Sequence, residues 1–377
     1  MTIIAVLNSR QSKTPICQDE WIINTTAAVV EAVEADQWEI ISSVGMFTWD
    51  FVTWVAAAHK PRLHLVVPRV KGTDGREIIQ AIEADFGLAP ERVDWRFIDV
   101  EATNVETKKW WPLRDSMVVD LANIIRPVSL RRGGNWDEIL YRSPTPLRID
   151  HRFEVSVHDP ESHHLRMLVD SPALTPPIQD WGGDWLIHWT RTCHGPWPGE
   201  TKAQFFECFS EWCPEYCHSA YKTLLHILQE KRIRASAKKI GDKRAVVAFT
   251  DLSPVASLEL MRWRPRWTNW AFEPYGIAIH RDLAATLGIR PVRYVPAAGW
   301  KAVPTEEKPF THSDGKTDPI WPMEHEWRCL GDVDLASIPP EAIRIIVRER
   351  AEAEKAIKQL AAEVFTFMER APDDLDE

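Results

Sequence analysis

Residues 184–200 read DWLIHWTRTCHGPWPGE, and they mark a change of architecture within the chain. Trp185 to Thr190 has the aromatic and β-branched composition of a strand. The strand ends on His188, Thr190 and Arg191, and a segment with two prolines and two glycines follows. Alternation places His188 and Thr190 on one face. Such an ending is typical either of ordinary packing or of a cleft that binds a nucleotide.

Before this stretch, apolar runs alternate with helical patterns. The sequence predicts strands at residues 3–8, 38–45, 63–68, 93–100 and 124–130, and helices at 19–35, 48–59, 76–86 and 114–122. Strands that alternate with helices of this length pair in parallel through crossovers. We therefore expect an α/β N-terminal domain with a doubly wound, mostly parallel sheet.

After residue 184 strands predominate, with a helix at 219–231, and residues 351–370 have the spacing of a final amphipathic helix. This order is typical of an α+β domain. Prolines recur between the two patterns and predict an irregular connector. The expected organisation is a first domain at 1–141, a proline-rich connector at 142–184 and a second domain at 185–377.

Composition limits the function. The chain of 377 residues has 45 Lys and Arg against 55 Asp and Glu, a formal charge of -10, which disfavours a general coat for nucleic acid. No apolar run approaches the ~18 residues that span a bilayer, so no membrane partner and a cytoplasmic location are expected. Six cysteines in a chain of this length do not indicate a disulfide framework.

Some of these cysteines are close together in the sequence. Cys208, Cys213 and Cys217 fall within one segment, and His218 follows. Zinc ligands usually come in pairs two to four residues apart on turns. We leave open whether these residues bind a metal or are reduced, partly buried thiols, and the favoured interpretation is that there is no metal site.

In a doubly wound sheet, ligands bind at the carboxyl ends of the strands, where helix N-termini offer free amides. Gly45 closes the second expected strand, and Gly133 and Gly134 follow the fifth. The run LRDSMVVDLANIIRPVSLRRGG, residues 113–134, resembles the closing unit of the Rossmann-like superfamily that includes DNA-processing and lonely-guy-type phosphoribohydrolase proteins. Its matching positions are Arg114, Asp115, Gly133 and Gly134. The catalytic members read GGxGTxxE, whereas Asn135 follows here, so the resemblance implies binding of a nucleotide more than its hydrolysis.

The second domain carries another resemblance. LIHWTR (186–191), TLLHILQEKRIRAS (223–236), VVAFTDLSPVAS (246–257) and MEHEWR (323–328) are similar to the motifs of the ADP-ribosyltransferase fold. The resemblance implies NAD as substrate, Glu326 and His188 as catalytic residues, and Thr190, Arg191, Ser253 and Tyr275 as residues that bind the dinucleotide. Glu324 and Glu326 match the ExE arrangement of arginine-modifying members. Trp189 departs from the pattern, because many members have glycine there.

Three functions remain open. The first is an NAD-dependent ADP-ribosyltransferase or NAD glycohydrolase-like effector, regulated by a first domain that binds a nucleotide ligand. In it the acceptor of ADP-ribose is a protein, a nucleic acid or water. The second is an N-glycosidase acting on a nucleotide or nucleoside in the first domain, and the third is a non-enzymatic nucleotide sensor acting through a partner or a homo-oligomer. The phrases FTDLSP, WAFEPYGIAI and MEHEWR are similar to a bacterial family associated with phage defence.

Overall fold

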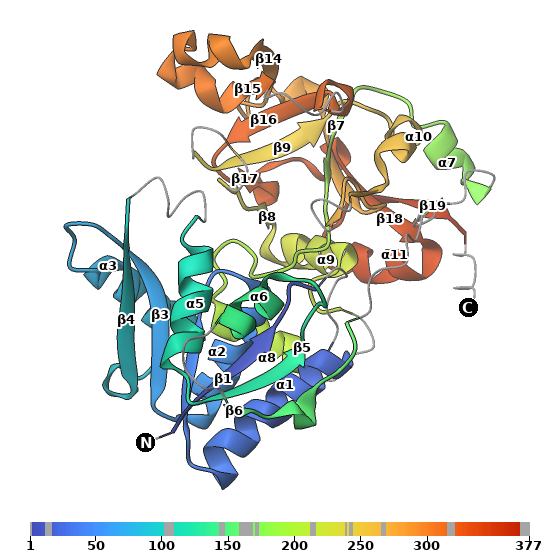
Figure 1. Ribbon diagram of the computed structural model, residues 1–377. Helices are drawn as coiled ribbons and strands as arrows, with labels where there is room; N and C mark the ends of the chain where they lie inside the picture. The colour runs from blue at the N-terminus through green and yellow to red at the C-terminus, as the bar shows by residue number, and fades with distance from the viewer. Residues whose placement is uncertain are drawn as a thin grey trace. The chain divides into compact units, whose positions relative to one another are not determined.

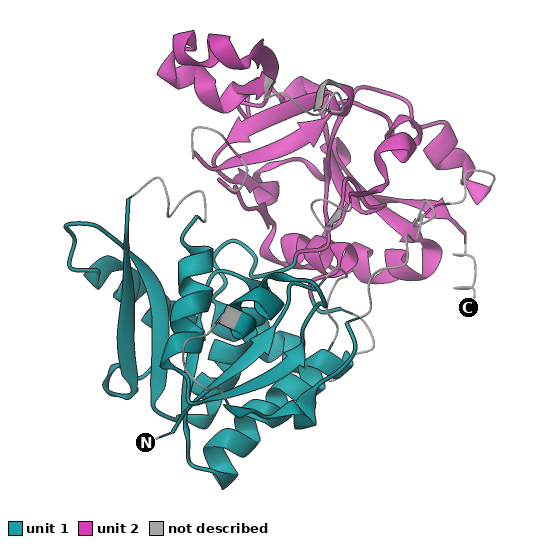
Figure 2. Cartoon of the chain, viewed as in Figure 1, with its two compact units in different colours: residues 1–161, 194–217 teal, residues 162–193, 218–377 magenta. Residues whose placement is uncertain are grey.

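The computed structural model describes residues 2–369 except 12–16, 102–108, 143–147, 158–168, 170–172, 212–215, 238–239, 241–243, 265–268 and 315–320. The chain forms two compact units, and each unit is built from two separate segments of the sequence (Figure 2). Unit 1 comprises residues 1–161 and 194–217, and unit 2 comprises residues 162–193 and 218–377.

Unit 1 is an α/β fold, as expected (Figure 1). Its six-stranded sheet has the order β4-β3-β2-β1-β5-β6, and all of its pairs are parallel. The strands are β1 (Ile3–Asn8), β2 (Glu39–Ser43), β3 (Leu63–Val70), β4 (Val93–Val100), β5 (Ile124–Ser129) and β6 (Arg148–Ile149). The chain adds β2 to β4 on one side of β1 and then returns to place β5 on the other side, so the topological switch point lies between β1 and β5.

Helices cover both faces of this sheet. They are α1 (Glu20–Val30, extended by a π-helical turn over Glu31–Ala35), α2 (Phe47–His59), α3 (Arg76–Phe86), α5 (Trp111–Leu121), α6 (Asn135–Arg142) and α8 (Lys202–Ser210). Alternate residues of β1 enter different cores. Ile4 and Val6 pack in a core with α1, α2, α3 and α8, whereas Ala5 and Leu7 pack in a core with α5 and α6. Burial on both faces explains why the inner strands β1, β3 and β5 are largely apolar runs.

Helix α8 lies in unit 1, although we expected its residues to belong to a domain at 185–377. Its buried Phe205, Phe206 and Phe209 pack against Phe47 of α2 with ring centroids 5.4–6.1 Å apart. Thr201 caps the helix through a capping box with Gln204. The apolar face of α8 thus docks into the core of the first unit, and residues 194–217 go with it. The connector expected at 142–184 is likewise divided at residue 161.

Unit 2 contains a mixed seven-stranded sheet with the order β13-β16-β9-β7-β12-β18-β19. Its strands are β7 (Trp185–Trp189), β9 (Val246–Thr250), β12 (Gly276–His280), β13 (Arg290–Pro291), β16 (Glu326–Leu330), β18 (Ile343–Glu349) and β19 (Glu363–Met368). Neighbours pair antiparallel except β18 and β19, which are parallel. Gly276 lets β12 approach β7, because a Cβ there would lie 3.0 Å from the carbonyl oxygen of His188.

Short elements complete unit 2. The helices are α7 (Pro176–Gln179), α9 (Ala220–Glu230), α10 (Pro254–Ser257) and α11 (Arg350–Ile357). Two-stranded ribbons pair β8 (Arg232–Ile233) with β17 (Val333–Asp334), β10 (Trp263–Arg264) with β11 (Asn269–Trp270), and β14 (Arg293–Pro296) with β15 (Thr311–Asp314). The prediction of one helix over 351–370 is wrong, because α11 ends at Ile357 and the chain then forms β19. Phe365 and Phe367 of β19 are buried, which favours the strand.

Candidate functional site

A cavity of about 150 Å³ in unit 2 brings together several of the residues singled out in the sequence. It is lined by Ile187, His188, Trp189, Arg191, Ile240, Ala248, Phe249, Thr250, Phe272, His312, Glu324, Glu326 and Arg328. His188 and Glu326 therefore face one cavity, although 138 positions separate them (326 − 188). Arg191 and Glu324 also line this cavity.

Strand pairing explains why His188 and Glu326 line the same cavity. Strand β9 lies between β7, which carries His188, and β16, which carries Glu326. Thr250 pairs with Ile187 on one side and with Glu326 on the other. Alternation along β16 then places Glu326 and Arg328 on the cavity side, while Trp327 between them hydrogen-bonds to Asp251.

His188 is held in one tautomer. Its Nδ1 lies 2.8 Å from the carbonyl oxygen of Ala248. A carbonyl only accepts, so Nδ1 carries the proton and donates, which leaves Nε2 of the neutral ring as an acceptor. Burial, together with the charge of Arg191, lowers the pKa of His188 to about 4. The ring is therefore a neutral hydrogen-bond acceptor at physiological pH.

This pKa predicts how stability responds to acid. The folded pKa of about 4 lies below the ordinary value of 6.5, so between these pH values the unfolded chain binds a proton that the folded chain does not. The contribution of His188 to stability is complete above pH 6.5 and decreases as the pH falls toward 4. We expect urea unfolding to show a larger loss of stability from pH 7 to pH 5 in the wild type than in His188→Asn, which keeps a donor for Ala248. Equal losses would contradict the assignment.

Arg191 is the cation that the cavity presents to a ligand. Its guanidinium lies 5.9 Å from the centroid of the Phe272 ring, and it forms no hydrogen bond or ion pair with any residue that the structure describes. Burial lowers its pKa, and the charge of Glu324 opposes this effect. A guanidinium with free donors in a concave site is suited to binding an anion.

The two carboxylates of the cavity each pair with a different arginine. Glu326 accepts two parallel hydrogen bonds from Arg328, at 2.8 Å from Nε and 2.9 Å from Nη2. Arg328 is itself buried and donates to the carbonyl oxygen of Pro309 at 2.8 Å. Glu324 pairs with Arg264, and both side chains are almost completely buried. Glu326 is thus fixed in orientation by a bidentate ion pair.

Three expected ligand residues of unit 2 lie outside the lining of this cavity. Thr190 is buried, and its hydroxyl donates to the carbonyl oxygens of Ala220 and Tyr275. Ser253 caps α10 by accepting from the backbone N–H of Ala256. The Tyr275 hydroxyl donates to Glu352 at 2.8 Å, and burial raises the pKa of that hydroxyl. These contacts give all three a structural role, and the aromatic wall of the cavity is supplied instead by Trp189, Phe249 and Phe272.

In unit 1, three of the expected residues, Gly45, Arg114 and Asp115, form hydrogen bonds within the unit. Gly45 follows β2 with a φ of 94°, and its N–H donates to the Asp50 carboxylate at 2.8 Å. Arg114 of α5 is 1 % exposed, donates to Asp115 at 2.7 Å, and is enclosed by the rings of Trp49, Trp110 and Trp111. Burial raises the pKa of both Asp50 and Asp115. Arg114 and Asp115 therefore form an internal ion pair.

Gly133 and Gly134 form the turn between β5 and α6. Gly133 has a φ of 67°, and its N–H donates to Asp137 within the first turn of the helix. Trp136 of α6 packs edge-on against Trp49, with ring centroids 5.9 Å apart, and its indole donates to the carbonyl oxygen of Asn8. This turn lies at the carboxyl ends of β1 and β5, at the topological switch point.

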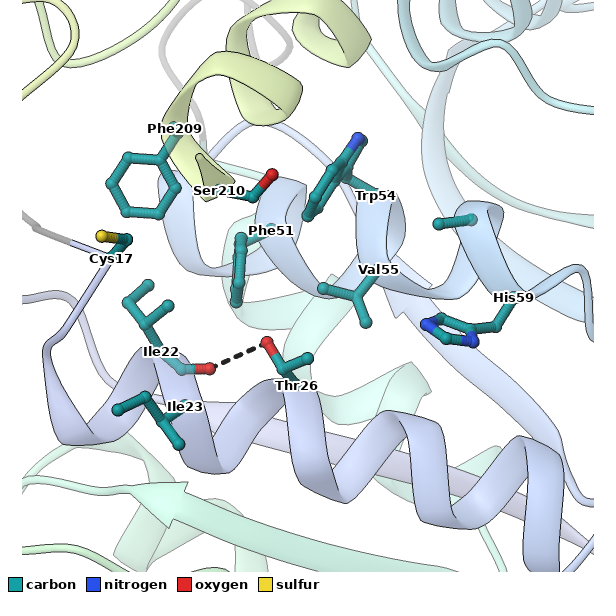
Figure 3. A pocket seen from close by; sticks show the side chains of 11 residues that line it. Cys17, Ile22, Ile23, Thr26, Phe51, Trp54, Val55, His59, Phe209 and Ser210 are labelled. Carbon is teal, nitrogen blue, oxygen red and sulfur yellow. Dashed lines mark hydrogen bonds between the residues drawn. The ribbon is translucent and has the colours of Figure 1, made fainter. Parts of the chain in front are cut away.

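A second hollow lies on unit 1, between α1, α2 and the end of α8 (Figure 3). Its volume is about 350 Å³, and its walls are mainly apolar, with Ile22, Ile23, Phe51, Trp54 and Phe209 among them. The hydroxyls of Thr26 and Ser210 donate to carbonyl oxygens of their own helices. No sequence pattern predicted this hollow, because its lining comes from ordinary amphipathic helix faces.

The cysteines suggested as metal ligands are only partly described. Cys208 and Cys217 are neighbours in unit 1, and burial together with Cys208 raises the pKa of the Cys217 thiol. The sulfur atoms of Cys208 and Cys217 lie within 4.8 Å of each other, and His218, the next residue in the chain, is buried. Cys213 lies outside the described residues.

Arg328 and Glu273 were missed in the sequence. Glu273 is a buried carboxylate that receives two hydrogen bonds from Thr192, the residue after Arg191. Arg328 could have been predicted as a partner of Glu326, because it follows Glu326 by two residues on a strand and therefore lies on the same face. The partner of Glu273 is 81 positions away, which local patterns do not reveal.

Comparisons with protein-family models, with curated proteins and with solved structures found no match for this chain. Among the described residues, no helix combines the length and the apolar character needed to cross a membrane.

Proposed function

We propose that unit 2 binds NAD and cleaves the bond between nicotinamide and ribose, as an ADP-ribosyltransferase or an NAD glycohydrolase does. The observation that carries the proposal is that His188, Arg191 and Glu326 line one cavity. These residues offer a hydrogen-bond acceptor, a cation that has no hydrogen-bond or ion-pair partner among the described residues, and an oriented carboxylate. A ligand that satisfies all three carries hydroxyl groups, an anion and a centre that becomes positive during the reaction.

Glu326 would support the chemical step. Cleavage of the N-glycosidic bond lets nicotinamide leave with the bonding electron pair, and positive charge develops on the ribose ring. A carboxylate held beside that ring stabilises the developing charge more than it stabilises the neutral ribose. Arg328 fixes both oxygens of Glu326, so the carboxylate reaches this position without reorganising. The acceptor of the ribosyl group is then water, a protein or a nucleic acid.

The other groups would bind the dinucleotide. Nε2 of His188 would accept a hydrogen bond from a ribose hydroxyl, and Arg191 would donate to the diphosphate. The cavity of about 150 Å³ is smaller than the roughly 300–1,000 Å³ of complete ligand sites. It therefore suits the nicotinamide riboside end, with the adenylate end extending beyond it.

Unit 1 would bind a nucleotide that regulates unit 2. The support is its parallel sheet with a switch point between β1 and β5, where such folds bind ligands. Asn8 ends β1, Ser129 ends β5, and the Gln11 amide donates to the Ser129 hydroxyl across this point. The burial of Arg114 and Asp115 gives them a supporting role in this unit rather than direct contact with the nucleotide.

Chromatography of small-molecule products separates the three functions. Purified protein is incubated with NAD and, separately, with nucleoside monophosphates. Release of free nicotinamide supports the proposal, and release of a free base from a monophosphate supports an N-glycosidase in unit 1. If neither substrate is consumed and a nucleotide raises the melting temperature, the chain is a sensor. Wild-type protein that leaves NAD intact under all nucleotide additions overturns the proposal.

A further inference from the structure

Glu273 is a buried acid beside the cavity that the proposed chemistry does not use. It is 6 % exposed and lies in the segment that leads into β12. One carboxylate oxygen accepts the backbone N–H of Thr192 at 2.5 Å, and the other accepts the Thr192 hydroxyl at 2.8 Å. Both oxygens thus serve one residue, and Glu273 is not among the residues that line the cavity.

These bonds fix the chain where it leaves β7. Thr190 is held by its N–H, which donates to Tyr275 at 2.8 Å, and by its hydroxyl, which donates to Ala220 at 2.9 Å. Thr192 is held by Glu273. Arg191 lies between the two, so its Cα has little freedom, and its side chain lines the cavity, whereas Thr190 and Thr192 are not among the lining residues.

Glu273 also places a negative charge near Arg191. The guanidinium has no partner among the described residues, and the nearby carboxylates that act on it are Glu324, Glu326 and Glu273. Glu324 and Glu326 each pair with another arginine, whereas Glu273 has only the neutral donors of Thr192. Burial raises the pKa of Glu273, whereas the two Thr192 donors and the charge of Arg191 lower it.

We propose that Glu273 is a positioning residue that holds Arg191 ready for the anionic group of the ligand. It acts through Thr192 and does not touch the ligand itself. The inference rests on the proposed function only in taking Arg191 as the anion-binding group, and it predicts that the binding of an anion depends on a carboxylate that no anion contacts.

The test is calorimetric titration of the full chain with inorganic pyrophosphate, which carries the anion without the nucleoside. We expect Glu273→Gln to weaken binding about 10-fold or more, since it keeps the side-chain shape but loses one of the two acceptors that fix Thr192. Thr192→Val removes one of the two hydrogen bonds and should give a smaller loss. The matched control is Glu341→Gln, because Glu341 is exposed in unit 2 and should leave binding unchanged.

A double-mutant cycle identifies the route of the effect. In an Arg191→Gln background, Glu273→Gln should cause no further loss of pyrophosphate binding, because the two residues act in series. Equal losses in both backgrounds would overturn the inference, as would unchanged binding in Glu273→Gln or wild-type protein that does not bind pyrophosphate. If Glu273→Gln does not fold, Thr192→Val serves in the same cycle. NAD cleavage is scored separately, so it can fail while this dependence stands.

Discussion

Glu326→Asp is expected to slow nicotinamide release from NAD by about 100-fold, because removing one methylene moves the charge by roughly 1 Å from the reacting ring. The variant keeps a carboxylate for Arg328, which is buried and would otherwise lose its partner. Its melting temperature should therefore remain close to that of the wild type. Glu326→Gln removes the charge itself and should reduce the rate by roughly 10²–10³-fold.

The control for this pair is Asp282→Asn, since Asp282 has a side chain that is 86 % exposed and lies outside the cavity. It should release nicotinamide at the wild-type rate. Rates within twofold of the wild type for both Glu326 variants would show that another group carries the chemistry. Circular dichroism of each variant separates a loss of chemistry from a loss of fold.

Arg126→Met should lower the free energy of unfolding of unit 1 by about 3–5 kcal/mol. The Arg126 side chain is 0 % exposed and donates to the carbonyl oxygen of Ala28 at 2.6 Å, to Glu31 at 2.9 Å, to Asp36 at 3.1 Å and to Asp150 at 3.0 Å. Methionine fills much of the same volume but satisfies none of these acceptors. The loss comes from removing the Arg126 donor to the carbonyl oxygen of Ala28, which is buried, and the ion-pair partner of Asp36.

Arg152→Gln is the matched control, because Arg152 also pairs with Glu31 and Asp150 but its side chain is 59 % exposed. Its effect on the free energy of unfolding should stay within about 1 kcal/mol. Both values come from urea unfolding followed by circular dichroism. If Arg126→Met and Arg152→Gln lower the free energy of unfolding by the same amount, the hydrogen bonds of Arg126 do not stabilise the sheet and helix α1 in the way described.

Local patterns were enough to predict the fold of unit 1. Strands β1, β3 and β5 are short, largely apolar runs, and the helices between the strands repeat apolar residues at helical spacing, so each element is encoded within its own residues. Parallel pairing follows from the alternation of strands and helices. The mixed sheet of unit 2 agrees with the expected α+β fold class, but its strand order was not predicted.

The placement of residues 194–217 and 351–370 could not be predicted in the same way. Helix α8 follows β7 in the sequence, yet its phenylalanines complete the core of unit 1. This placement depends on long-range packing, which local sequence patterns do not reveal. Residues 363–368 carry an alternating pattern, EVFTFM, that the preceding run of Ala, Glu and Lys concealed.

The candidate site was predictable in part. His188 and Glu326 stand at positions where a strand end presents a polar side chain, and this signal is visible in the sequence. The lining of the cavity also depends on the order of β16, β9 and β7, which long-range pairing determines. Tyr275 illustrates the limit, because it immediately precedes β12 but packs against Tyr221 and donates to Glu352.

The most direct test of the central claim is calorimetric titration with ADP-ribose. This ligand has the ribose hydroxyls and the diphosphate but lacks nicotinamide, and with it the bond that the proposed reaction cleaves. The account predicts that the wild type binds it, and that His188→Ala and Arg191→Gln each weaken binding about 10-fold or more while both stay folded. Binding that is the same in all three proteins would place the ligand elsewhere. No binding in the wild type would contradict the claim that these residues form one site for a hydroxylated anion.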